Sequence, residues 1–377
     1  MLIMPCLSVY RMAESAALTS TGRGAEGPST AKVGSEQDMK PLRVLALVHD
    51  YLVPPDDVRG VDVVNAPWKT EFDVTNTLAA MGHKVYTAGI GNTIGTIADW
   101  ANEIQPSIVF NLMEAFREIG TFDQNIVSHL ELVQLQYTGC NPRGLILSRD
   151  KALTKTILAS NGIPVPEFVI FRRGHIVQQP TRLRFPLIVK SLTQDASFGI
   201  AQASIVTSER QFAERVAFVH DALHTDAIAE QYIDGRELYV GVIGNERLHA
   251  FPVWEMQFEK MPAGVHRIAT ARVKWSSDYQ QKNGIRCGKA RLSRRSREDI
   301  QSIAKQAFRC LQMNGYGRID IRLDAEGRPW VLEANANPQL AYGEDFAESA
   351  HHDGVPYESL LQRILNVGLQ WRAERGG

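Results

Sequence analysis

Residues 316–336 read YGRIDIRLDAEGRPWVLEANA. The first eight alternate between polar and apolar side chains, which is typical of a strand with one buried face. Residues 324–327 then begin with Asp and end with Gly, and this order favours a tight turn. A second strand resumes at residues 330–333. The stretch therefore predicts an antiparallel β-hairpin, and the order of its side chains decides which groups meet.

The middle of the turn fixes which side chains of the hairpin face each other. Asp320 pairs with Glu333, and Arg318 pairs with Asn335. Because side chains alternate along a strand, all four of these polar side chains lie on one face. The opposite side, which faces the core, takes four apolar residues: Ile319, Ile321, Leu332 and Ala334.

Two carboxylates and an amide on one face are a typical ligand set for Mg²⁺, which prefers oxygen donors and shares its coordination with substrate phosphates. Asp320, Glu333 and Asn335 are therefore the predicted metal ligands. Like charges directly opposite one another are destabilising without a cation between them, which favours this interpretation. The alternative is a solvated hairpin face with cross-strand ion pairs. Arg318 would lie where negative charge develops in a transition state.

The composition is that of a globular protein without a charge bias. The chain has 377 residues, with 41 Lys and Arg against 42 Asp and Glu, and 44% of its residues are hydrophobic. This length predicts two or three domains. The near-zero net charge argues against binding to nucleic acid or to a membrane through bulk charge, and no apolar run is long enough to span a membrane. The four cysteines form no CxxC pair, so we expect a cytoplasmic protein.

The distribution of apolar residues predicts a tail followed by three structured units. The tail is poor in large apolar side chains and is predicted to be disordered, with Met39 as an alternative natural start. The first unit shows a β-α-β-α-β alternation, which predicts a doubly wound domain. The second opens with a helix for which Ser148 is the expected N-cap, and the third contains a stretch, residues 255–293, that we expect to be irregular. The predicted bounds are 1–39 for the tail and 40–140, 141–229 and 230–377 for the units.

Several motifs in one order resemble the ATP-grasp superfamily, specifically its D-alanine–D-alanine ligase-like branch. Gly317–Asp320 and Val331–Asn335 resemble the metal-binding end of these enzymes. The motifs that precede them in the family's order are Tyr137–Cys140, Ser148–Lys151, Ile163–Pro166, Pro186–Lys190, Ser197–Gly199 and Glu237. Several motifs in a shared order are more specific than any single one. The resemblance implies an α/β ATP-grasp fold, in which a doubly wound, Rossmann-like pre-ATP-grasp domain precedes two α+β lobes that clamp ATP.

The resemblance implies which side chains bind the phosphates of ATP. Lys151 and Lys190 would contact them directly, and the small-residue loop that contains Ser197 would cover them. Lys274 would approach from the irregular stretch, which corresponds to a mobile loop of the family. Arg318 would steady the tetrahedral oxyanion. The predicted catalytic residues are thus Arg318, Lys274 and Ser197.

The resemblance also implies that the connection between the two ATP-grasp lobes is the adenine site. Its backbone would read the base while an aromatic ring packs on it, and its residues are Glu230, Gln231, Tyr232 and Ile233. Glu237 would take the ribose hydroxyls. Taken singly, without the resemblance, Tyr232 would be a core aromatic residue and Glu237 a solvated strand end.

The predicted substrate residues depart from the family. Glu71 could stand in for a family glutamate that holds the first D-alanine, and Glu114 replaces a histidine. Gln339 and Glu344 lie where the family has small residues that cradle a carboxylate. Because Glu114 and Glu344 would repel the carboxylates of D-alanine, we expect substrates different from two D-alanines.

We therefore expect an ADP-forming carbon–nitrogen ligase that uses ATP and Mg²⁺, with Mn²⁺ as an alternative ion. A substrate carboxylate would attack the γ-phosphate to give an acyl phosphate, from which an amine would displace phosphate. The expected partners are a small-molecule carboxylate and an amine, without nucleic acid or membrane, and a homodimer is the assembly considered. The alternatives are a D-alanine–D-alanine or other dipeptide ligase and, in another class, a non-catalytic ATP-binding regulatory protein. A carboxylase is disfavoured because nothing in the chain resembles a biotin-carrying segment.

Overall fold

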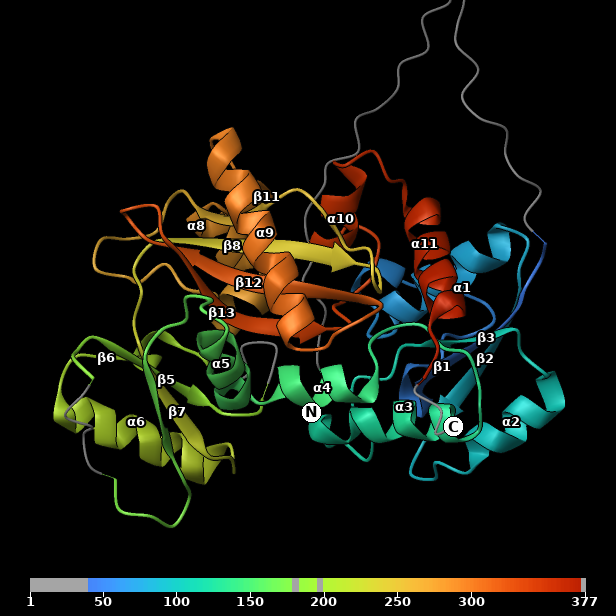
Figure 1. Cartoon of the computed structure of the whole chain (residues 1–377), viewed down its shortest axis with the longest axis horizontal. Helices are drawn as coiled ribbons and strands as arrows, with labels where there is room; N and C mark the ends of the chain where they lie inside the picture. Colours follow the sequence, from blue (N-terminus) through green and yellow to red (C-terminus); the bar gives the residue numbers. More distant parts are fainter. Residues whose placement is uncertain (1–39, 178–182, 195–198, 374–377) are drawn as a thin grey trace, which may run out of the picture.

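The computed structural model describes residues 40–177, 183–194 and 199–373. Three β-sheets follow one another along the chain, with helices packed against them (Figure 1). This arrangement is of the α/β class that the sequence predicts. The predicted disordered tail, residues 1–39, lies outside the described residues, as does Ser197.

The first sheet is parallel and has helices on both sides. Its elements are β1 (Arg43–His49), α1 (Lys69–Ala80), β2 (Lys84–Ile90), α2 (Thr96–Ile104), β3 (Ile108–Asn111) and α3 (Asp123–Leu132). The strands lie in the order β2-β1-β3. After its first residue β1 is buried throughout, as expected of a strand covered on both faces. The predicted doubly wound arrangement is confirmed.

The second sheet is antiparallel and has a long helix on one face. Its elements are α4 (Pro142–Arg149), α5 (Lys151–Ser160), β4 (Phe168–Phe171), β5 (Leu187–Ser191), β6 (Ile205–Val206), α6 (Glu209–Ala222) and β7 (Ala227–Gln231). The strands lie in the order β4-β7-β5-β6. Phe212, Val216 and Val219, spaced along one side of α6, form an apolar cluster with these strands.

The helix that we expected Ser148 to cap begins two residues later, so this prediction was wrong. Ser148 lies inside α4, which starts earlier because Asn141 caps it and Pro142 is its first residue. Asp150 is the N-cap of α5, and its side chain accepts hydrogen bonds from the second and third helical residues, both at 2.9 Å. The chain thus turns at Asp150, and Lys151 opens α5.

The third sheet is the largest and contains the hairpin. Its elements are β8 (Arg236–Ile243), β9 (His249–Ala250), β10 (Trp254–Phe258), α7 (Ala271–Trp275), α8 (Ser277–Asn283), β11 (Ile285–Lys289), α9 (Arg294–Cys310), β12 (Tyr316–Leu323) and β13 (Pro329–Ala336). The strands lie in the order β11-β10-β8-β12-β13, with β9 beside β8. The prediction that residues 255–293 are irregular was wrong, since they include most of β10, both short helices and β11. Only Ile285 of β11 is buried, so this strand has no alternating apolar pattern to recognise.

The C-terminal helices α10 (Asp345–His351) and α11 (Tyr357–Gln370) return to the first sheet. Figure 1 shows α11 beside α1 and the strands of that sheet. Leu361 and Leu365 of α11 belong to one buried cluster with Val44 of β1 and Val74 of α1. The predicted bounds of the units remain predictions, but the end of the third unit shares a core with the first.

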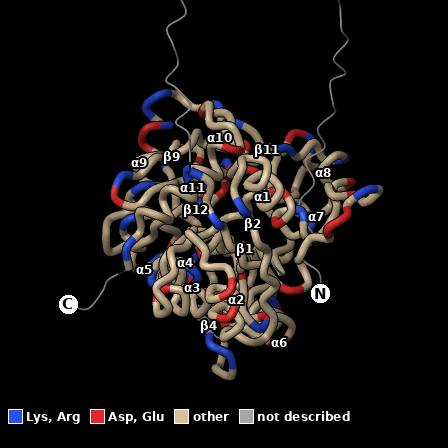
Figure 2. The backbone as a smooth tube through the Cα atoms, turned by 90° about the vertical axis from the view of Figure 1, so that its right-hand side faces the viewer, with Lys and Arg blue, Asp and Glu red and all other residues tan. Residues whose placement is uncertain are grey.

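Charged residues of both signs are spread over the fold. Lys and Arg segments alternate with Asp and Glu segments along the tube in the view of Figure 2, in keeping with the formal net charge of −1. Among the described residues, no helix combines the length and the apolar character needed to cross a membrane.

Truncation of Leu361 tests whether α11 belongs to the N-terminal core. Leu361→Ala should lower the free energy of unfolding by about 2–5 kcal/mol, because this fully buried leucine leaves a cavity. Urea denaturation followed by circular dichroism measures the change. Arg363→Ala, on the exposed side of α11, is the matched control and should stay within about 0.5 kcal/mol of the wild type. Equal stability of the two variants would contradict the docking of α11 on the first sheet.

Candidate active site

The strands β12 and β13 have the register that the sequence predicts for the polar face of the hairpin. Asp320 lies opposite Glu333, and Arg318 lies opposite Asn335. β12 is also paired along its other edge with β8, so these side chains lie within the largest sheet rather than on a free ribbon. None of the four is exposed, which disfavours the alternative of a solvated hairpin face.

A β-bulge changes the register of the hairpin beyond Asp320. The shift by one residue lies between Asp320 and Ile321, and Ile321 pairs with Val331. Val331 is therefore buried in the core, whereas Leu332 is only half-buried. The prediction that Leu332 faces the core was wrong, because it assumed an unbroken register.

Arg318 and Asp320, two residues apart on β12, form a bidentate ion pair. Arg318 donates to the two oxygens of Asp320 at 2.7 and 2.9 Å, a bond along the strand that the sequence did not predict. The guanidinium lies 4.7 Å from the centre of the Tyr239 ring. Burial raises the pKa of the Asp320 carboxyl, against the opposing effect of Arg318. Arg318 is thus fixed beside the predicted metal ligands.

Glu333 faces cations that come from four different elements. The Lys151 amino group of α5 lies 4.0 Å from its carboxylate. Burial alone would raise the pKa of Glu333, but Lys151, Lys190, Lys274 and Arg318 lower it to about 2. The structure therefore brings the predicted phosphate-binding lysines and the predicted metal-binding carboxylate to one place.

The predicted metal ligands form a small set of oxygen donors. Within the described ranges, no three or more His, Cys, Asp or Glu side chains are grouped to hold a metal ion. Asp320 and Glu333 supply two carboxylates, and Asn335 adds an amide. The side-chain nitrogen of Asn335 is buried without a hydrogen-bond partner among the described residues. An amide donor left this way favours a hydrogen-bond acceptor at the hairpin face, such as a phosphate oxygen.

A buried ion-pair network lies behind the predicted phosphate-binding lysines, and it includes Lys155, a residue that the sequence did not predict. Glu230 of β7 lies 3.1 Å from the Lys190 amino group and 3.4 Å from that of Lys155. Lys155 also donates to the Leu332 carbonyl at 2.6 Å, next to a predicted metal ligand. Burial lowers the pKa of Lys155 to about 8, although Glu230 opposes this shift. The spacing of four residues from Lys151 on one helix is the signal that could have found Lys155.

The predicted adenine site is the connection between β7 and β8. The Tyr232 ring is half-buried and meets the His266 ring edge to face, with 5.2 Å between their centres. Gln231 is exposed, whereas Glu230 and Ile233 are buried. Their contact with adenine remains a prediction.

Glu237, predicted for the ribose, lies on β8 in a buried network. One of its carboxylate oxygens accepts from the Tyr239 hydroxyl at 3.0 Å. The other accepts from Arg322 at 2.8 Å and from the backbone N–H of Ala269 at 3.3 Å. A ribose hydroxyl would share oxygens that already have partners, so the ribose contact also remains a prediction.

Hydrogen bonds join the second and third units at residues that follow Ser197 closely in the sequence. Gln202 exchanges two hydrogen bonds with the backbone of His266, each at 2.9 Å. The backbone N–H of Ala271, the first residue of α7, donates to the Ile200 carbonyl at 3.1 Å. These bonds hold the helix that carries Lys274 against the second unit. The role of Ser197 itself remains a prediction.

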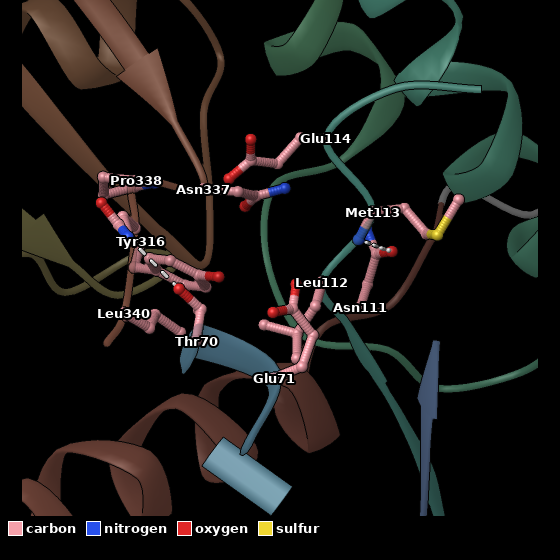
Figure 3. Close-up of a pocket in the computed structure, with 11 residues that line it drawn as sticks. Thr70, Glu71, Asn111, Leu112, Met113, Glu114, Tyr316, Asn337, Pro338 and Leu340 are labelled. Carbon is pink, nitrogen blue, oxygen red and sulfur yellow. Dashed lines mark hydrogen bonds between the residues drawn. The ribbon is translucent and has the colours of Figure 1, made fainter. Parts of the chain in front are cut away.

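Three of the four predicted substrate residues line one small pocket, which Figure 3 shows. Glu71 of α1, Glu114 after β3 and Gln339 after β13 meet there, although they come from distant parts of the sequence. The rest of the polar wall is formed by Thr70, Asn111, Tyr316 and Asn337. Burial raises the pKa of Glu71 to about 8, and the charge of Glu114 adds to this effect.

The fourth predicted substrate residue, Glu344, precedes α10 and does not line this pocket. Burial and the charge of Asp345 raise its pKa to about 8, while Lys69 and Arg318 oppose the shift. Lys69 lies 2.5 Å from Asp73 and donates to a backbone carbonyl of the β13–α10 loop at 2.7 Å. The second of these bonds ties α1 to the loop that carries Glu344.

Comparison with known sequences places the chain in a family. The sequence model of the family described as D-ala D-ala ligase C-terminus matches residues 157–366. The D-alanine–D-alanine ligase of Bordetella petrii is 32% identical over 246 residues, which cover 65% of this chain and 71% of that one. A protein of Sinorhizobium fredii described as uncharacterized protein y4sG is 32% identical over 260 residues, or 69% of this chain and 74% of that one.

Solved structures show the same fold. The D-alanine–D-alanine ligase from Bacillus anthracis complexed with ATP superposes with a TM-score of 0.67 at 17% identity and covers 87% of this chain and 98% of its own. The enzyme from Coxiella burnetii gives a TM-score of 0.63 at 19% identity, with 88% and 94% covered. The predicted ATP-grasp fold is confirmed. The family match and the fold together show that this chain is an ATP-grasp ligase of the D-alanine–D-alanine ligase family.

Proposed function

We propose that this ligase uses ATP and Mg²⁺ to join a carboxylate to an amine through an acyl phosphate, and that its substrates differ from two D-alanines. The observation that carries the proposal is the gathering of Lys151, Lys190 and Lys274 around Glu333, directly opposite Asp320. Fixed cations next to paired carboxylates are what a nucleotide phosphate and its metal ion need. A cytoplasmic location and two small-molecule substrates complete the proposal.

The donor set fits Mg²⁺. Glu333 stays ionised at neutral pH because the surrounding cations lower its pKa to about 2. Asp320 and Asn335 lie on the same face, and the three donors are too few to enclose an ion without phosphate oxygens. Asp320, Glu333 and Asn335 would hold the ion, which when bound would neutralise charge on the phosphates. Mn²⁺ accepts similar oxygen donors and is the alternative ion.

The residues of this chain have separate roles in the proposed reaction. Lys151, Lys190 and Lys274 neutralise the phosphates. The hydrogen bonds between the second and third units hold the helix that carries Lys274 in place. Lys155 acts as a positioning residue, because it binds both Glu230, at the adenine end, and the backbone of the strand that carries Glu333. A nucleotide that is fixed at both ends presents its terminal phosphate in one orientation.

The two chemical steps of the proposed reaction need no reactant other than ATP, the acid and the amine. A carboxylate oxygen of the acid bonds to the γ-phosphorus while the bond to the bridging oxygen breaks, so ADP leaves. The amine nitrogen then bonds to the carbonyl carbon, the carbon–oxygen bond to phosphate breaks, and the amine loses a proton. Arg318, fixed by Asp320, is the group that would stabilise the oxyanion between these events.

Acidic side chains on the substrate side support substrates other than two D-alanines. Glu71 and Glu114 line the pocket without a Lys, Arg or His among the lining residues. A substrate carboxylate would find no cation among these lining residues, and the charge of Glu114 would repel it. A D-alanine–D-alanine or other dipeptide ligase is the alternative in the same class. A regulatory ATP-binding protein is the alternative in another class, but it would not need Arg318 fixed beside two paired carboxylates.

Removal of the Glu333 charge tests the proposed catalytic site. Glu333→Gln should slow phosphate release from ATP by at least about 100-fold, because several kcal/mol of charge stabilisation are lost. The assay uses the full chain with ATP, Mg²⁺ and a cell metabolite extract. Glu326→Gln, at the exposed turn of the same hairpin, is the matched control and should keep the wild-type rate. An unchanged rate in Glu333→Gln would favour the regulatory alternative.

D-Alanine as the only added substrate tests the substrate assignment. Phosphate release from ATP should stay at its rate without D-alanine, since Glu114 and Glu344 would face its carboxylates. Liquid chromatography with mass spectrometry should detect no D-alanyl-D-alanine. Formation of that dipeptide with kcat/KM of about 10⁴ M⁻¹s⁻¹ or more would show that the chain is an ordinary D-alanine–D-alanine ligase.

A further inference from the structure

We infer that Arg215 of α6 is a positioning residue for the nucleotide, because it fixes the segment of the second unit that holds the helix carrying Lys274. This segment, residues 199–204, is called the anchored segment below. The inference deepens the proposed ligase function and rests on it. It identifies the side chain on which the contacts between the two units depend.

Arg215 is buried, although the other Asp, Glu and Arg residues of α6 are exposed. Only 7% of its surface is exposed, and its guanidinium lies 4.4 Å from the centre of the Phe218 ring. Its Nε atom is buried without a hydrogen-bond partner among the described residues. A buried charge is costly unless hydrogen bonds compensate it. The position of Arg215 therefore depends on the two bonds that its Nη2 atom makes.

Both of these hydrogen bonds go to the anchored segment. Arg215 donates to the Gly199 carbonyl and, at 2.7 Å, to the Ser204 hydroxyl. Ser204 is fully buried, and its hydroxyl also accepts from the backbone N–H of Ala201 at 3.0 Å. One guanidinium thus binds both ends of the anchored segment and joins them to the middle of a long helix.

The residues between these two ends make the contacts with the third unit. The Ile200 carbonyl accepts from the backbone N–H of Ala271 at 3.1 Å. Gln202 exchanges two hydrogen bonds with the backbone of His266, each at 2.9 Å. Ala271 begins α7, three residues before Lys274. A shift of the anchored segment would therefore move the start of the helix that carries this lysine.

The three predicted phosphate-binding lysines come from two units, so contacts between the units set their spacing. Lys151 of α5 and Lys190 of β5 belong to the second unit, whereas Lys274 of α7 belongs to the third. The helix α7 has only five residues, and a helix of this length is not stable by itself. Its place relative to the other two lysines depends on the bonds to the anchored segment, and those bonds depend on Arg215.

Hydrogen exchange followed by mass spectrometry tests the structural link, with the full chain and without nucleotide. Arg215→Gln should raise the exchange rate of the amides around Ala271 at least about 10-fold, because the acceptor at Ile200 is no longer held in place. Exchange in α9 should stay unchanged, since the third unit keeps its fold. Arg210→Gln, on the exposed side of α6, is the matched control and should leave both regions unchanged.

A double-mutant cycle on nucleotide binding tests the positioning role. Isothermal titration with a non-hydrolysable ATP analogue and Mg²⁺ compares the wild type with Arg215→Gln, Lys274→Gln and the double variant. Arg215→Gln should weaken binding at least about 5-fold. The double variant should bind within about 2-fold of Lys274→Gln alone, because an anchor for this lysine has no effect once its amino group is absent.

Two results would overturn the inference. One is unchanged exchange around Ala271 in Arg215→Gln. The other is a double variant whose loss of affinity equals the product of the two single losses, as expected if Arg215 only stabilises α6. If Arg215→Gln does not fold, Ser204→Ala removes one of the two acceptors and is expected to change exchange and affinity in the same direction.

The titration of the wild type separates this inference from the proposed function. If the analogue binds and Arg215→Gln changes neither exchange nor affinity, the inference fails while the proposed ligase function stands. If the analogue does not bind to the wild type, the proposed function fails. Faster exchange around Ala271 in Arg215→Gln would then support Arg215 as an anchor of α7 alone.

Discussion

The placement of Asp320 and Glu333 opposite each other on neighbouring strands is the constraint on which the rest of the site depends. Two carboxylates at this spacing in a protein interior repel each other unless cations compensate them. Arg318 compensates Asp320 through two hydrogen bonds, and lysines from three other elements compensate Glu333. The pKa of Asp320 is raised and that of Glu333 is lowered, so the pair is held in an environment that a bound cation would stabilise further.

The hairpin separates two regions of opposite charge. On one side, lysines of α5, β5 and α7 gather around Glu333, and Glu230 holds the β5 lysine, Lys190, in a buried network with Lys155. On the other side, acidic residues of α1, the chain after β3 and the loop before α10 form the proposed substrate region. The near-zero net charge of the chain hides this division. A triphosphate and an amine are complementary to the two regions, and their reacting groups would meet at the hairpin.

The parts of the site that sequence could predict depend on local patterns. The hairpin register follows from a turn and an alternation within one short stretch, and the structure has that register up to Asp320. The pairing of Lys155 of α5 with Glu230 of β7 joins residues that are distant in sequence, so no local pattern predicts it. The bulge beyond Asp320 lies within the hairpin itself, but the alternation of its side chains gives no sign of the shift. β11 was missed because only Ile285 of this strand is buried. The prediction that Ser148 is an N-cap was wrong because a second capping residue, Asp150, follows two positions later. Only the packed fold selects between the two.

Product identification tests the central claim most directly. The full-length protein is incubated with ATP, Mg²⁺ and a cell metabolite extract, and the mixture is analysed by mass spectrometry. Ligation through an acyl phosphate predicts ADP and phosphate in equal amounts, together with a new compound whose mass is that of an acid plus an amine minus one water. ADP without a condensation product, or AMP and pyrophosphate in its place, would contradict ligation at this site.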